Sequence, residues 1–206
     1  MDQCPLHYVW RDRRNADADP GASYQRALQD DPHNGYAHAM WGHWLLLREP
    51  GRVEDALKHF EAARQDGRDS AFVLDLQLGA MLGNEALVPE LLRLLSRLRG
   101  AAAPLPDGQK QRVWSQVYSR SYRAAERQCL LGALAPEDGL RTFLWLFPQA
   151  TESQGQAWSV VRAQLLTHAG RGEEARTELL SMQAEWKAQK TTGPIVDEVK
   201  WLLAGR

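Results

Sequence analysis

The stretch NGYAHAMWGHWLLL, from Asn34 to Leu47, has helical spacing but no polar face. On a helix, the residues at three- and four-residue steps from Tyr36 to Leu47 lie on one side, and alanines, leucines and two tryptophans cover most of the rest. A helix of this kind must be covered by neighbours on several sides. The stretch therefore predicts an inner helix that other helices surround.

The rest of the chain has ordinary globular composition. Its 206 residues are 44% hydrophobic and 25% charged, which is enough chain for one or two domains with a core. The net charge of -1 provides no overall attraction to nucleic acid or to an anionic membrane. The charge is uneven, however, because residues 93–127 contain 8 Lys and Arg against 2 Asp and Glu. The middle of the chain is basic.

Cysteine usage and hydropathy indicate the compartment. Cys4 and Cys129 are far apart and form no CxxC pair, so neither a disulfide framework nor a zinc cluster is implied. The first twenty residues have no apolar segment of signal-peptide length, and the most apolar runs are too short to span a bilayer. We expect a cytoplasmic protein that does not contact a membrane.

Helical periodicity recurs along the chain, whereas alternating strand patterns are missing. The pattern predicts an all-α fold, with breaks at Gly, Pro and Asn. The predicted helices are 5–13, 20–29, 35–48, 53–65, 70–82, 85–99, 109–131, 136–147, 155–169, 172–188 and 194–204. Three of them begin with a proline in the first turn, where the missing N–H costs nothing.

Internal similarity points to a repeat. The segment YQRALQDDP from Tyr24 aligns with FEAARQDG from Phe60 at an offset of 36 residues. A second echo relates GRVEDAL, which begins at Gly51, to GRGEEAR, which begins at Gly170. Offsets of this size are typical of arrays in which helix pairs stack to bury a shared core.

The sequence resembles the tetratricopeptide repeat. The best-matching unit, 35–69, has Gly42 at the helix crossing, Phe60 at the aromatic packing position and small residues at Ala56 and Ala63, with Pro32 before it. A second unit, 155–186, matches at Trp158, Leu165, Gly170, Ala175 and Leu179. The sequence departs from the motif at Trp41, which replaces a leucine, at a Glu-Pro insertion in the turn, and over most of 70–148.

The resemblance implies a right-handed α-solenoid of antiparallel helix hairpins that forms a single domain over 1–206. We expect two sub-arrays, 1–100 and 109–206, joined by the proline-containing loop 101–108, AAAPLPDG. The last helix, 194–204, would cap the array with a solvated outer face.

The resemblance also implies a binding groove along the inner helices. The groove residues would be Tyr36, Ala39, His43, Trp44 and Leu46. Some repeats of this family hold a terminal carboxylate with Lys, Asn and Arg, but the corresponding positions here are Ala39, Met40 and His43. We therefore expect an adaptor or chaperone-like module that binds an apolar or helical segment of another protein.

A second candidate surface lies on the predicted helix 109–131. Helical winding places four arginines on one arc, namely Arg112, Arg120, Arg123 and Arg127. The arc is either a solvated outer face or a docking strip for an acidic partner segment. As the alternative function, an α-solenoid could bind nucleic acid through the same strip, because arginine pairs with carboxylates and phosphates alike.

Catalytic motifs are absent from the sequence. There is no GxGxxG, Walker loop, HExxH or GxSxG pattern, so we expect no enzyme, no cofactor and no small-molecule substrate. His33, His38 and His43 are five residues apart, unlike the i, i+4 pair that binds a metal on a helix, and we interpret them as core or groove residues. Cys129 lies on an apolar arc and is interpreted as an inert thiol.

Overall fold

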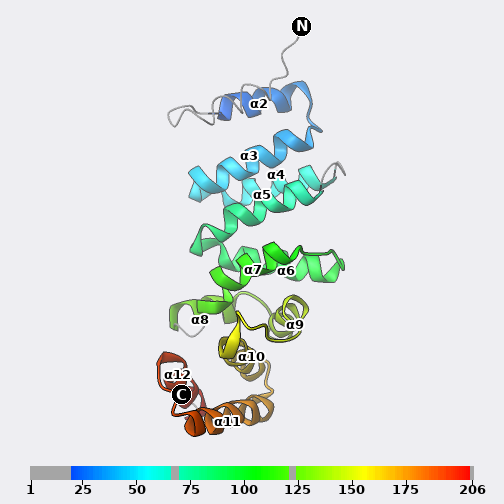
Figure 1. Cartoon of the computed structure of the whole chain (residues 1–206). Helices are drawn as coiled ribbons and strands as arrows, with labels where there is room; N and C mark the ends of the chain where they lie inside the picture. Colours follow the sequence, from blue (N-terminus) through cyan, green and yellow to red (C-terminus); the bar gives the residue numbers. More distant parts are fainter. Residues whose placement is uncertain (1–19, 66–69, 121–123, 205–206) are drawn as a thin grey trace. The chain divides into compact units, whose positions relative to one another are not determined.

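The structure, a computed structural model, describes residues 20–65, 70–120 and 124–204. Within these ranges every regular element is a helix, and no strand occurs, which confirms the predicted all-α class (Figure 1). The predicted helix 5–13 lies outside the described residues. The chain divides into two compact units, which we call unit 1 (Met1–Gly83) and unit 2 (Asn84–Arg206). The segment 101–108, where the sequence predicted a joining loop, lies inside unit 2.

Unit 1 is built around the apolar stretch. Its described elements are α2 (Gly21–Asp30), α3 (Gly35–Arg48), η1 (Pro50–Arg52), α4 (Val53–Gln65) and α5 (Ser70–Leu82). Helix α3 contacts α2, α4 and α5 (Figure 1). These three neighbours cover α3 on several sides, which explains why its sequence has no polar face.

The boundaries of α3 follow from its own residues. The Asn34 side chain accepts a hydrogen bond from the backbone N–H of Ala37 at 2.9 Å, which satisfies one of the unpaired donors of the first turn. The helix ends at Arg48, two residues before Pro50. The proline ring clashes with a helical conformation of the residue before it, Glu49, and so ends the helix. Both ends agree with the predicted helix 35–48.

Gly42 of α3 lies close against α4. A Cβ atom at this position would lie 2.9 Å from the Ala56 carbonyl oxygen and 3.1 Å from the Phe60 ring. Ala56, Phe60 and Ala63 are fully buried in α4. A glycine on one helix and small residues on the other therefore allow the two backbones to approach.

Unit 2 contains the remaining elements. They are η2 (Glu85–Leu87), α6 (Val88–Gly100), α7 (Asp107–Gln116), η3 (Tyr118–Arg120), α8 (Ala124–Gly132), α9 (Pro136–Leu146), α10 (Gly155–His168), α11 (Gly172–Gln189) and α12 (Pro194–Leu203). Helix α10 contacts α9, α11, α12 and η3. As predicted, α9 and α12 begin with a proline, at Pro136 and Pro194.

The prediction of one continuous helix over 109–131 is wrong. Helix α7 ends at Gln116, and a 3₁₀ turn, Tyr118–Arg120, follows before α8. Two serines at the break bond to backbone carbonyl groups, Ser115 Oγ to Arg112 at 3.1 Å and Ser119 Oγ to Ser115 at 2.8 Å. Serine hydroxyls compete in this way with the helical hydrogen-bond ladder, and the segment has few strong helix formers to oppose them.

An aromatic cluster forms part of the core of unit 2. Tyr118 is buried against Phe143 and Phe147, with ring centroids 5.2 and 5.5 Å apart. Trp114 meets Phe147 edge-on at 5.4 Å. The indole N–H of Trp158 donates to the Phe147 carbonyl oxygen at 3.1 Å, so the indole nitrogen has a hydrogen-bond partner within the cluster. These contacts join α7 and η3 to α9 and α10.

No single helix within the described ranges has both the length and the apolar character needed to cross a membrane.

Candidate functional site

The predicted groove residues fall into two groups in unit 1. Tyr36, His43 and Trp44 are half-buried, whereas Ala39 is 0% exposed and Leu46 is 3% exposed. The structure therefore places Ala39 and Leu46 in the core, where α3 meets its neighbours. On an all-apolar helix, hydropathy alone does not separate a groove position from a core position.

The half-buried residues connect α3 to α5. The Tyr36 ring stacks on Phe72 with centroids 5.3 Å apart and an interplanar angle of 4°. His43 Nδ1 lies 3.1 Å from the Leu76 carbonyl oxygen; because a carbonyl only accepts, the His43 nitrogen is the donor. These contacts form a seam between α3 and α5, which we call the α3–α5 seam.

Leu47 was missed among the predicted groove residues. It is 55% exposed, the most exposed of the large apolar side chains described. It follows His43 by four residues and therefore lies on the same side of α3 as the α3–α5 seam. That spacing was the signal in the sequence that could have identified it.

Trp44 belongs to a second aromatic group. Its ring stacks on Trp41 at 5.2 Å with an interplanar angle of 6°, and Trp41 meets Tyr24 of α2 edge-on at 5.6 Å. Trp41 is buried, whereas Trp44 is half-buried. Trp44 is thus stacked on the buried Trp41 ring and is itself partly exposed to solvent.

His38 and His59 form a direct pair that sequence spacing did not predict. Their Nδ1 atoms, on α3 and α4, lie 2.8 Å apart. His38 Nε2 also lies 3.0 Å from the Pro32 carbonyl oxygen, in the turn before α3. Burial, and then the nearby His38, lower the pKa of His59 from 6.5 to about 4. The His59 side chain is therefore neutral at neutral pH.

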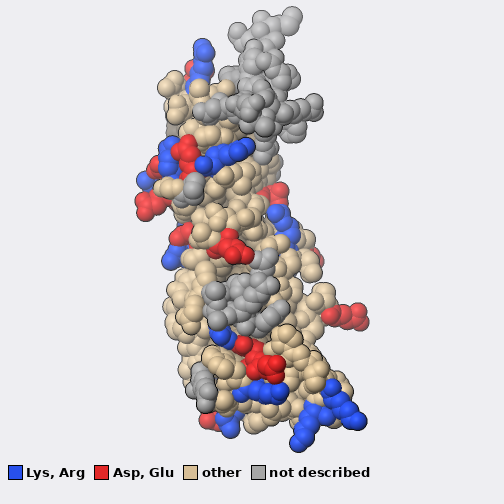
Figure 2. All heavy atoms as spheres, turned by 90° about the vertical axis from the view of Figure 1, so that its left-hand side faces the viewer, with Lys and Arg blue, Asp and Glu red and all other residues tan. Residues whose placement is uncertain are grey.

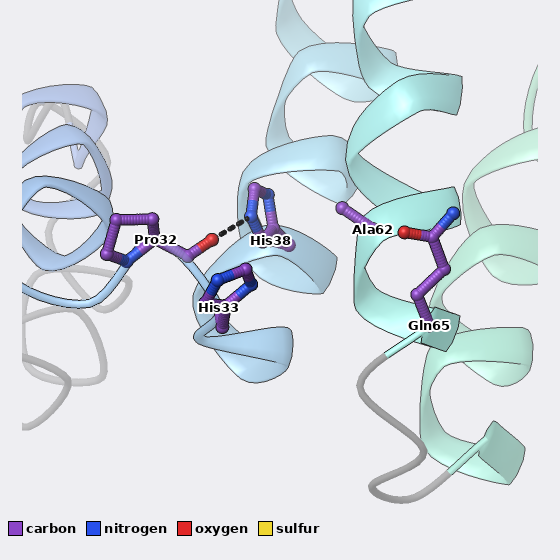
Figure 3. A pocket seen from close by; sticks show the side chains of 5 residues that line it. All are labelled: Pro32, His33, His38, Ala62 and Gln65. Carbon is purple, nitrogen blue, oxygen red and sulfur yellow. Dashed lines mark hydrogen bonds between the residues drawn. The ribbon is translucent and has the colours of Figure 1, made fainter.

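A small pocket adjoins this pair. It has a volume of about 120 Å³ and is lined by Pro32, His33, His38, Ala62 and Gln65 (Figure 3). The residues come from the α2–α3 turn, from α3 and from the C-terminal part of α4. This volume is far below that of a typical small-molecule site. The pocket therefore opens His38 to solvent but does not indicate an organic ligand.

The predicted basic strip is not a single helical arc, because its helix is broken. Arg112 lies exposed on α7, while Arg123 and the side chain of Arg120 lie outside what the structure describes. On the face in Figure 2, most Lys and Arg side chains lie close to Asp or Glu side chains rather than in one basic patch. A shared docking face for the four arginines was predicted from a helical geometry that the chain does not adopt.

Arg127 instead joins α8 to α12. Its guanidinium group forms an ion pair with Glu198 and lies over the Trp201 ring, 4.3 Å from the centroid. Glu198 also accepts a hydrogen bond from Gln164 of α10 at 2.9 Å. The Arg127 and Glu198 side chains are only 11% and 12% exposed. We call these four residues the Arg127 cluster; in it, Arg127 is used for packing within unit 2.

Metal and thiol chemistry find little support in the described part of the chain. No group of three or more His, Cys, Asp or Glu side chains described there could hold a metal ion. Cys129 is half-buried, and burial raises the pKa of its thiol. A raised pKa disfavours the reactive thiolate, as expected of an inert cysteine.

Comparisons with known proteins add no relatives: no protein-family model, no curated protein and no solved structure matches the chain.

Proposed function

We propose that this protein is a divergent tetratricopeptide-like module that binds a segment of another protein and has no catalytic activity. The close approach of α3 and α4 at Gly42, beside Ala56 and Phe60, supports a helical hairpin of this type. The packing of α3 against both α4 and α5 supports stacking of one hairpin on the next element. We further propose that the stacking is right-handed, as in this repeat family, and that the protein acts in the cytoplasm.

The exposure of Leu47 is the observation that carries the binding proposal. A leucine that is 55% exposed, one helical turn after the half-buried His43 of the α3–α5 seam, offers an apolar anchor point on an otherwise covered helix. Carboxylate-binding Lys or Arg side chains are missing from the corresponding positions of α3. The partner we propose is therefore an apolar or amphipathic helical segment rather than a charged tail.

The test is capture of a partner by the full chain, followed by affinity measurement with the purified partner segment. Leu47→Asp places a charge at the anchor point, and we expect it to weaken binding at least about tenfold. Leu180→Asp is the matched control, because Leu180 is 44% exposed on α11 in unit 2. Leu46 is unsuitable for this purpose, since its burial means that a charge there would disturb folding.

Two results would contradict the proposal. One is a partner that binds wild type and Leu47→Asp equally. The other is binding to DNA or RNA that weakens steeply between about 50 and 200 mM salt, which is the behaviour of phosphate contacts. Circular dichroism of both variants must match wild type before the affinities are compared.

A further inference from the structure

The hydrogen bonds of the His38–His59 pair determine where its protons are. The Pro32 carbonyl oxygen can only accept, so His38 Nε2 must carry a hydrogen (Figure 3). When His38 is neutral, its Nδ1 therefore has a free lone pair. His59 Nδ1, 2.8 Å away, must then carry the hydrogen that joins the two rings.

The same geometry also accommodates one additional proton. If His38 is protonated, both of its ring nitrogens donate, one to Pro32 and one to His59. His59 then accepts at Nδ1 and keeps its own hydrogen on Nε2. The bond survives and becomes charge-assisted. A second additional proton would place two N–H donors and two positive charges face to face, and the bond would be lost.

We propose that His38 and His59 form a proton-sharing joint between α3 and α4. The joint stays closed when the pair is neutral or carries one additional proton, and it opens when the pair takes up a second additional proton. The proposal concerns a contact inside unit 1 and holds whether or not that unit binds a partner.

The surroundings of the pair favour this behaviour. Trp41 presents a perpendicular ring to His59, with centroids 6.2 Å apart, and partial burial disfavours charge on His59. Asp55 attracts a proton to His59, but Arg52 opposes this effect, and burial and His38 outweigh it. His33 is the further titratable group at the pocket beside His38.

The test is side-chain nitrogen NMR of the full chain, labelled at histidine, between pH 8 and pH 3.5. At the high end we expect His38 in the Nε2–H form and His59 in the Nδ1–H form. His59 should become charged only near pH 4, and the Overhauser contact between the two rings should disappear in the same step. Finding the opposite tautomers, or a ring contact that survives when both rings are charged, would overturn the proposal.

A variant separates coupling from burial. His38→Gln keeps a hydrogen-bonding side chain but cannot be charged, so the His59 titration should move upward while remaining below 6.5. His168→Gln, an exposed position on α10, should leave it unchanged. An unmoved His59 titration in folded His38→Gln would show that burial alone controls His59 and would exclude proton sharing. If His38→Gln does not fold, the wild-type tautomers and ring contact decide the matter.

Discussion

The two units hold their helices together by different means. In unit 1, α3 and α4 approach because Gly42 has no side chain where it meets the Ala56 backbone and the Phe60 ring. In unit 2, α12 is fixed to α8 and α10 through an arginine, a glutamate and a glutamine with little exposure. Close apolar contact tolerates almost no added volume, whereas a buried ion pair tolerates no loss of one partner. The two units should therefore fail under different substitutions.

The largest effect is expected in the Arg127 cluster. Arg127→Met removes one charge and leaves Glu198 with little access to water, so unfolding should become easier by roughly 3–5 kcal/mol. The measurement is the urea midpoint. Arg52→Met is the control, because Arg52 pairs with Glu49 and Asp55 at 44% exposure, and losing these solvent-screened pairs should cost far less. Equal losses in the two variants would contradict the assigned difference in burial.

A smaller loss is expected at the helix crossing of unit 1. Gly42→Ala adds a methyl group 2.9 Å from a backbone oxygen, so the helices must shift, at a cost of about 1–3 kcal/mol. Gly108→Ala in α7 meets nothing within 4 Å and should be neutral or stabilise by up to ~1 kcal/mol through helix propensity. Hydrogen exchange of residues 35–65 should speed up in the first variant alone. Unchanged exchange there would mean that the crossing is looser than described.

The smallest effect is a pH dependence confined to unit 1. The pKa of His59 is about 4 in the folded protein and 6.5 in the unfolded chain, so the unfolded chain binds more protons between these values. Stability should therefore fall as the pH falls from 6.5 to 4, but by less than the pKa shift alone implies, because His59 is only half-buried and solvent screens its charge. Thermal unfolding of wild type and His59→Gln at several pH values tests this, and parallel curves would contradict it.

The helices themselves were largely predictable from the sequence. The all-apolar character of α3 indicated that several neighbours would cover it, and a capping asparagine and a proline marked its two ends. The break after Gln116 was not predictable from periodicity, because Val113, Trp114, Val117 and Tyr118 continue a helical apolar pattern across it. The serine hydrogen bonds that accompany the break depend on local geometry that hydropathy does not describe.

The site was less predictable than the fold. His38 and His59 are 21 residues apart and meet only because α3 and α4 cross, whereas spacing along one helix compared His38 with His33 and His43. Likewise, Arg127 pairs with a glutamate 71 residues away, which a helical projection of one segment does not contain. Contacts made where two helices cross can be identified only from the coordinates. Residues whose role depends on one helix alone can be predicted from the sequence pattern of that helix.

The position of Arg127 between Glu198 and Trp201 has a consequence for shortening the chain. Removing α12 would uncover the apolar surface beneath Val196 and Val199. It would also leave the Arg127 guanidinium group without its counter-charge and without the aromatic ring that it lies over. A truncation before Pro194 should therefore harm unit 2 more than the lost apolar area alone implies, and replacing Arg127 by methionine in the truncated chain should recover part of that loss.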